Sequence, residues 1–124
     1  ASVMDSLPTD MVVRRIDGVT VVRLKISNVS SAVDVTRLTA SINELIDSGD
    51  TRLVLDLKHV RYTGSATLGM LLELRQKMDK KGGHLVLSHA EPIEELLRIS
   101  KTARLFRIAP DPKAGVAMIR PTNR

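Results

Sequence analysis

Hydrophobic positions near the start of the chain recur at every second residue, which is the spacing of a β-strand. Two such runs, Met11–Ile16 and Val19–Ile26, flank the pair Asp17-Gly18, a strong signal for a two-residue hairpin turn. The second run divides its side chains between two faces: Val19, Val21, Arg23 and Lys25 on one, and Val22, Leu24 and Ile26 on the other. The pattern therefore predicts an antiparallel hairpin.

Helical spacing follows the hairpin. Ser31, with Asp34 three residues later, resembles a capping box, and Gly49 is placed to end the helix. Its apolar stripe is Val35, Leu38, Ile42, Leu45 and Ile46. A second helix is expected over Ala66–Lys80, with the stripe Leu68, Leu71, Leu72, Leu74 and Met78.

Two shorter helices are expected towards the C-terminus. Pro92 is placed as the first residue of one, where its missing N–H is tolerated, and Pro112–Ile119 forms the other. The helix that begins at Pro92 is expected to bury Ile93, Leu96, Leu97 and Ile99.

Three short apolar runs predict further strands: Arg52–Leu57, His84–Ser88 and Leu105–Ile108. Lys58–Ser65 is read as a loop. The order ββαβαβαβα predicts a single α/β domain with a mixed, mostly parallel sheet, an initial hairpin and helical cover. The domain is expected over residues 11–120, with flexible ends at 1–10 and 121–124.

Composition narrows the classes of function. The chain has 124 residues and no cysteine, which excludes disulfides and thiolate chemistry. It lacks a long apolar run and a signal-peptide pattern, so we expect a cytoplasmic protein without a membrane span. Its net charge of +5 raises the question of nucleic acid, but Tyr62 and Phe106 are the only aromatic residues, too few for base stacking. The basic residues form either a solvated surface or a face for an acidic protein partner.

No enzyme is predicted. His59, His84 and His89 lack the spacing of metal ligands, and no phosphate-binding loop or nucleophile with a base is present. Asp56 ends the buried strand, where its expected role is to accept backbone N–H groups in the following turn. We therefore expect no catalytic residue, no metal and no cofactor.

One segment, Val60–Gly69, leaves a buried strand and opens directly into a helix. Ser65 at this junction has two compatible interpretations. It caps the helix, at about 1 kcal/mol of stability, or it is an exposed hydroxyl that can be phosphorylated. A phosphate at a helix start is compatible with the fold but not with a closely packed partner.

The chain from about residue 11 to 108 resembles the STAS domain, the family of bacterial anti-sigma factor antagonists. The likeness lies in the order of Leu53-Val54-Leu55-Asp56-Leu57, Val60, Ser65, Leu68-Gly69, Leu71-Leu72, Gly82-Gly83, Leu85-Val86-Leu87 and Leu105-Phe106. The resemblance implies binding to an anti-sigma factor that is also a serine kinase, release of a sigma factor, and reversal by phosphorylation of Ser65. It implies a partner surface formed by Arg61, Tyr62, Thr63, Gly64, Ser65, Ala66, Thr67 and Gly69, in a monomer or weak homodimer that does not bind nucleic acid directly.

The family pattern at the helix start reads Asp-Ser-Ser-Gly-Leu-Gly, whereas this chain has Gly64-Ser65-Ala66-Thr67-Leu68-Gly69. The hydroxyl is kept, and its acidic neighbour is not. Two functions therefore stay open: a phospho-regulated anti-sigma factor antagonist, and a non-phosphorylated adaptor subunit of a transport or stress-signalling assembly.

Overall fold

The computed structural model describes residues 11–121 of the chain. Five strands form one sheet in the order β1-β2-β4-β6-β7, with β1 antiparallel to β2 and the other neighbours parallel. Their bounds are β1 Met11–Ile16, β2 Val19–Leu24, β4 Arg52–Asp56, β6 His84–Ser88 and β7 Arg107–Ala109. The predicted mixed, mostly parallel sheet is confirmed. The predicted flexible ends, 1–10 and 121–124, lie outside the described residues except for Pro121.

The hairpin turn has the backbone that its sequence predicts. Asp17 and Gly18 both have positive φ, at 52° and 81°, as a two-residue turn between twisted strands requires. The turn sets the register of β1 on β2, from Met11 opposite Leu24 to Ile16 opposite Val19. The two predicted faces of β2 are confirmed, with Val22 and Leu24 in one core cluster and Val19 and Val21 in the other.

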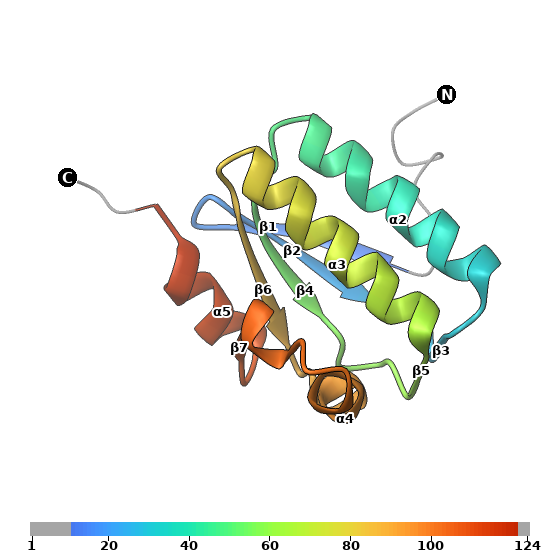
Figure 1. Cartoon of the computed structure of the whole chain (residues 1–124). Coiled ribbons are helices and arrows are strands. Elements are labelled where there is room, and N and C mark those ends of the chain that lie inside the picture. The colour runs from blue at the N-terminus through green and yellow to red at the C-terminus, as the bar shows by residue number, and fades with distance from the viewer. Residues whose placement is uncertain (1–10, 122–124) are drawn as a thin grey trace.

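Helices cover both faces of the sheet. Figure 1 shows α2 (Ala32–Asp47) and α3 (Ser65–Lys80) side by side across one face. They share the larger core with α4 (Glu91–Ile99) and with Val22 and Leu24 of β2. On the opposite face α5 (Pro112–Ile119) packs on Val19, Val21, Val54 and Val86. Gly115 permits this close approach, because a Cβ there would lie 3.1 Å from the methyl groups of Val54.

The helix boundaries are largely as predicted, with differences in which residues face inwards. Ser31 caps α2 by accepting the Asp34 N–H at 3.1 Å, and Gly49 follows the helix with a φ of 110°. α4 begins one residue before Pro92. The prediction that Ile99 is buried is wrong: its side chain is 63% exposed, because α4 turns its last apolar residue away from the core.

The buried stripe of α3 is rotated about the helix axis relative to the predicted apolar stripe. Its buried residues are Thr67, Met70, Leu71, Leu74 and Met78, while Leu68 and Leu72 are only half-buried. The helix must contact both the sheet and α2, and this shifts the inward face by about one residue. The predicted strand Leu105–Ile108 is also displaced: Ala103–Leu105 form the 3-10 turn η1, and β7 starts at Arg107.

A second, two-stranded sheet was not predicted. β3 (Asn28–Val29) pairs in parallel with β5 (Tyr62–Thr63), which lies inside the segment that the sequence indicates to be a loop. Strands of two residues have no measurable periodicity, so only the tertiary pairing reveals them.

The carboxyl end of β4 carries an ion pair between the buried Asp56 and the half-buried Arg23. Asp56 is fully buried, and its Oδ2 accepts the Arg23 Nε–H at 2.7 Å. Its Oδ1 accepts the Ser88 hydroxyl at 3.2 Å and the Lys58 N–H at 3.3 Å. The prediction that Asp56 accepts a backbone N–H group of the following turn is confirmed. The ion pair with Arg23 was not predicted. Together these bonds join β2, β4 and β6 to the start of the loop that leads to Ser65.

Replacing Arg23 with Gln is expected to lower the free energy of unfolding by about 3 kcal/mol, because the buried Asp56 carboxylate loses its charge partner. Urea denaturation of the variant measures this. Arg15→Gln is a matched control: the Arg15–Asp50 pair spans 2.8 Å, but the arginine side chain is 61% exposed, so its loss should cost about 1 kcal/mol or less. Equal costs for the two variants would contradict the assignment.

Candidate docking site at the start of α3

The segment before α3 is held by backbone bonds to the loop after β2. The N–H groups of Arg61 and Tyr62 both donate to the Ser27 carbonyl, at 2.7 and 3.0 Å. Tyr62 and Thr63 then pair with β3, and the Thr63 hydroxyl donates to the Pro92 carbonyl at 3.0 Å. The chain therefore reaches the helix on a fixed course, with β3 on one side and the start of α4 on the other.

Thr67, not Ser65, organises the start of α3. The residue at the cap position is Gly64, whose N–H donates to the Thr67 Oγ1 at 3.1 Å. The Thr67 hydroxyl in turn donates to the Val29 carbonyl of β3. The predicted cap at Ser65 is wrong, because the helix starts one residue earlier: Ser65 is its first residue, and α3 has no side-chain cap at Gly64.

The predicted partner surface is exposed in part. Arg61, Tyr62, Ser65 and Gly69 are exposed, and Thr63, Gly64 and Ala66 are half-buried. Tyr62 is the one large hydrophobic side chain among these residues, and 63% of its surface is exposed. Thr67 is 1% exposed, so its side chain does not belong to that surface, contrary to the prediction. Its two backbone bonds explain why it points inwards.

A groove between α2 and α3 adjoins Ser65. It has a volume of about 440 Å³ and is lined by Ala66, Gly69, Met70 and Glu73 of α3 and by Val35, Thr36, Thr39, Ala40 and Asn43 of α2. Of the α2 residues, only Val35 belongs to the predicted apolar stripe; the small and polar side chains of Thr36, Thr39, Ala40 and Asn43 give no core signal in the sequence. Their spacing of three and four residues was the only sign in the sequence that they share one face of the helix.

The electrostatics of the helix start favour an anion. No acidic residue lies in the first turn of α3, and the N–H groups there add the positive end of the helix dipole. Gly64 is not required by the backbone, since its φ of −155° is extended. A Cβ there would meet only Ser30 Cβ, at 3.6 Å. The aspartate of the family pattern would therefore fit this site.

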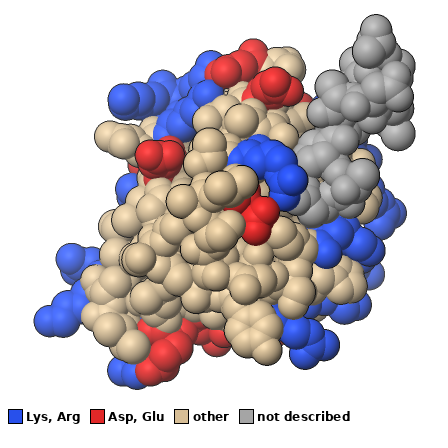
Figure 2. Space-filling model, turned by 90° about the vertical axis from the view of Figure 1, so that its right-hand side faces the viewer, with Lys and Arg blue, Asp and Glu red and all other residues tan. Residues whose placement is uncertain are grey.

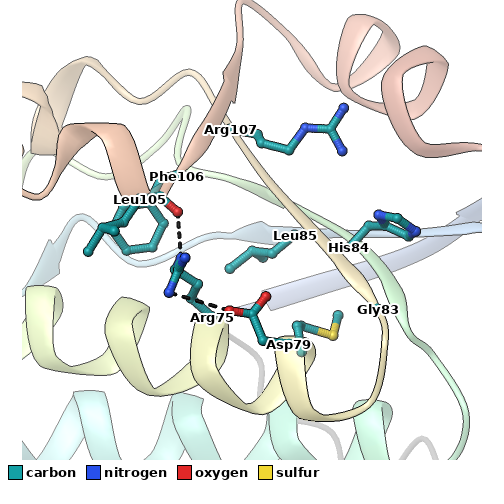
Figure 3. A pocket seen from close by; sticks show the side chains of 9 residues that line it. Arg75, Asp79, Gly83, His84, Leu85, Leu105, Phe106 and Arg107 are labelled. Atoms are coloured by element: carbon teal, nitrogen blue, oxygen red, sulfur yellow. Dashed lines mark hydrogen bonds and ion pairs between the residues drawn. The ribbon is translucent and has the colours of Figure 1, made fainter.

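A second hollow, of about 250 Å³, lies at the other end of α3 (Figure 3). Arg75 dominates its wall but is already engaged: its Nε donates to the Leu105 carbonyl at 2.6 Å, and its Nη1 lies 3.4 Å from Asp79 Oδ2. The other lining residues supply no nucleophile with a base. Arg75 thus serves to tie η1 to α3.

Within residues 11–121 no group of three or more His, Asp or Glu side chains is placed to hold a metal ion. Nor is any helix in this part of the chain both long and apolar enough to cross a membrane. The features that remain at the start of α3 are an exposed hydroxyl at Ser65 and a neighbouring groove.

Comparison with known proteins gives one family. The family model of the STAS domain matches residues 10–114. BtrV of Bordetella bronchiseptica, which bears the name of an anti-sigma factor antagonist, is 30% identical over 104 residues, or 83% of this chain and 88% of BtrV.

Solved structures have the same fold. TM1081 of Thermotoga maritima superposes with a TM-score of 0.77 at 18% identity, covering 90% of this chain and 95% of that protein. The unphosphorylated anti-sigma factor antagonist SpoIIAA, described as a Bacillus cell fate determinant, gives 0.70 at 14% identity, covering 90% and 99%. At these identities the likeness concerns the fold alone.

The roles of the two hydroxyls can be separated by mutation. Thr67→Val is expected to destabilise the domain by about 1–3 kcal/mol, because the Gly64 N–H loses its acceptor and the Val29 carbonyl its donor. Ser65→Ala should cost less than about 0.5 kcal/mol, as for other exposed positions. Thermal unfolding measures both, with Thr67→Ser as the variant that keeps the hydroxyl. A larger loss in Ser65→Ala would restore Ser65 as the cap.

Proposed function

This chain belongs to the STAS domain family of anti-sigma factor antagonists, and we propose that it binds an anti-sigma factor of the serine-kinase type and so releases a sigma factor. The observation that carries the proposal is the position of Ser65: exposed, first in α3, and next to the groove between α2 and α3. BtrV, which bears the name of an anti-sigma factor antagonist, aligns with 83% of this chain.

The surface around Ser65 has the apolar content that docking needs. Tyr62 is 63% exposed, and Val33, at the start of α2, is 76% exposed. The two residues lie on neighbouring segments, because α2 follows β3 and β3 pairs with β5. An exposed tyrosine is a suitable anchor for a partner surface. Contact across this surface buries Ser65 and excludes water from it.

Phosphorylation of Ser65 then reverses the binding. The kinase transfers the γ-phosphoryl group of ATP to the Ser65 Oγ, the hydroxyl proton leaves, and ADP is released. The phosphate adds about −1.5 to −2 charges. The N–H groups of the first turn of α3 accommodate this charge, so the domain stays folded. The closely packed partner does not, since the phosphate would have to be desolvated at the contact.

Gly64 favours a second candidate function. The family aspartate next to the serine is absent, and a kinase that reads this carboxylate would not modify the chain. In that case the domain is a constitutive adaptor in a transport or stress-signalling assembly. The docking surface serves both functions, and the two differ only in whether Ser65 is modified.

Incubation of the chain with its kinase and ATP is expected to add one phosphate, detected by intact mass, and Ser65→Ala should remain unmodified. Gly64→Asp, which restores the family residue in a backbone that accepts it, should increase the rate of phosphorylation. If the wild type stays unmodified while Gly64→Asp is labelled, the adaptor function is favoured. Equal labelling of Ser65→Ala would exclude Ser65 as the site.

A negative charge at Ser65 is expected to weaken partner binding without unfolding the domain. Ser65→Asp should lower the affinity for the anti-sigma factor by about tenfold or more, since a charge buried at a contact costs at least ~1.4 kcal/mol. Gln76→Glu adds the same charge to an exposed site three turns along α3 and should leave the affinity unchanged. Calorimetric titration compares the two variants. Unchanged affinity in Ser65→Asp would reject the proposed interface.

A further inference from the structure

The sheet face that carries α5 is left partly uncovered. α5 packs on β2, β4, β6 and β7, and beyond it β1 presents Val12, which is 42% exposed, and Arg14 to solvent. In the hairpin register Arg14 lies opposite Val21, and Val12 lies opposite Arg23. These side chains share a hollow of about 220 Å³, lined by Val12, Arg14, Ile16, Val21, Arg23, Lys25 and Pro112.

The hollow is strongly basic. It is lined by Arg14, Arg23 and Lys25 and by no carboxylate. In Figure 2, Lys and Arg side chains line the right-hand edge of the molecule, the side that lies behind the sheet in Figure 1, and others lie at the left-hand and upper edges. Arg23 is paired with the buried Asp56, so Arg14 and Lys25 supply the main positive charge of the hollow, and Asp111, next to Pro112, caps α5 by accepting the Ala114 N–H at 2.8 Å.

The loop after β4 extends the same positive field. The pKa of the His59 imidazole lies below its ordinary value, because partial desolvation and the nearby cations Lys25, Arg23 and Lys58 all disfavour its protonated form. The smaller effect of Asp56 in the opposite direction does not offset them. Lys25, Arg23 and Lys58 thus act together on the part of the surface around His59.

We propose that this hollow is a docking site for an acidic, extended segment of a partner protein, separate from the surface around Ser65. Its floor alternates apolar and cationic side chains, from Val12 through Arg14 to Ile16 along β1. An extended segment in which every second side chain, along one face, is alternately a carboxylate and an aliphatic group matches both kinds of contact. The two docking surfaces lie on different faces of the sheet, so both can be occupied in one assembly.

The lining favours a peptide over the other anionic ligands. No aromatic side chain lies in the hollow, so unstacked bases have no platform, and a phosphate backbone does not use the apolar floor. An anionic bilayer is also disfavoured, since the apolar side chains line a concavity with Pro112 in its wall rather than a protruding surface. Binding of nucleic acid or of an anionic bilayer is therefore a competing outcome of the test.

The test uses a fluorescent peptide of about ten residues in which every second position is alternately Glu and Val and the positions between are Ser, with a Gln-for-Glu peptide as the uncharged probe. Anisotropy titration should show binding of the acidic peptide that weakens as salt is raised from about 50 to about 300 mM. Arg14→Gln/Lys25→Gln should weaken binding by about tenfold, the loss expected for two exposed charge contacts. Arg23 is left in place because it holds Asp56.

The control Lys80→Gln/Arg104→Gln removes the same two charges from exposed positions outside the hollow and should keep wild-type affinity. Circular dichroism verifies that both double variants are folded. Equal loss in the control, or no binding of the acidic peptide, would overturn the proposal. So would tighter binding of a single-stranded oligonucleotide or of vesicles of phosphatidylserine and phosphatidylcholine, if that binding depended on Arg14 and Lys25.

Discussion

The buried carboxylate of Asp56 is the constraint on which the carboxyl end of the sheet depends. An ionised group without solvent must find charge and hydrogen-bond partners, or its burial costs several kcal/mol. Here the partners come from β2, β6 and the loop after β4: Arg23, Ser88 and Lys58. The hydrogen bonds of the Asp56 carboxylate therefore link β2, β4 and β6 and fix the point at which the chain leaves β4.

That exit point determines the geometry of the docking surface. After Lys58 the chain turns to meet Ser27 and β3, and Thr67 closes the arrangement by bonding to both Gly64 and Val29. Every polar group that fixes the course of the segment faces inwards, which leaves Ser65 and Tyr62 exposed. A phosphate added to Ser65 would change the surface without breaking a bond that holds the helix start, and this is the property that a reversible switch requires.

The two faces of β2 show how one strand serves two different surfaces. Val22 and Leu24 enter the core beneath α2 and α3, whereas Val19 and Val21 pack towards α5. Because α5 has only eight residues, its cover ends before β1, and there the sheet carries Arg14 and Val12. Charged side chains on an edge strand also discourage unspecific pairing with other strands. The basic hollow is thus compatible with a stable fold and available to a partner.

The sequence by itself determined the elements whose signal is local. The turn at Asp17-Gly18, the cap at Ser31 and the helix Pro112–Ile119 were all predictable, because backbone preference and periodicity act within a few residues. It also located the segment around Ser65. The burial of Thr67 and the pairing of β3 with β5 needed the tertiary structure, since both join segments that lie far apart in the sequence. The same holds for the groove and the basic hollow: their walls come from elements that meet only when the sheet and helices pack.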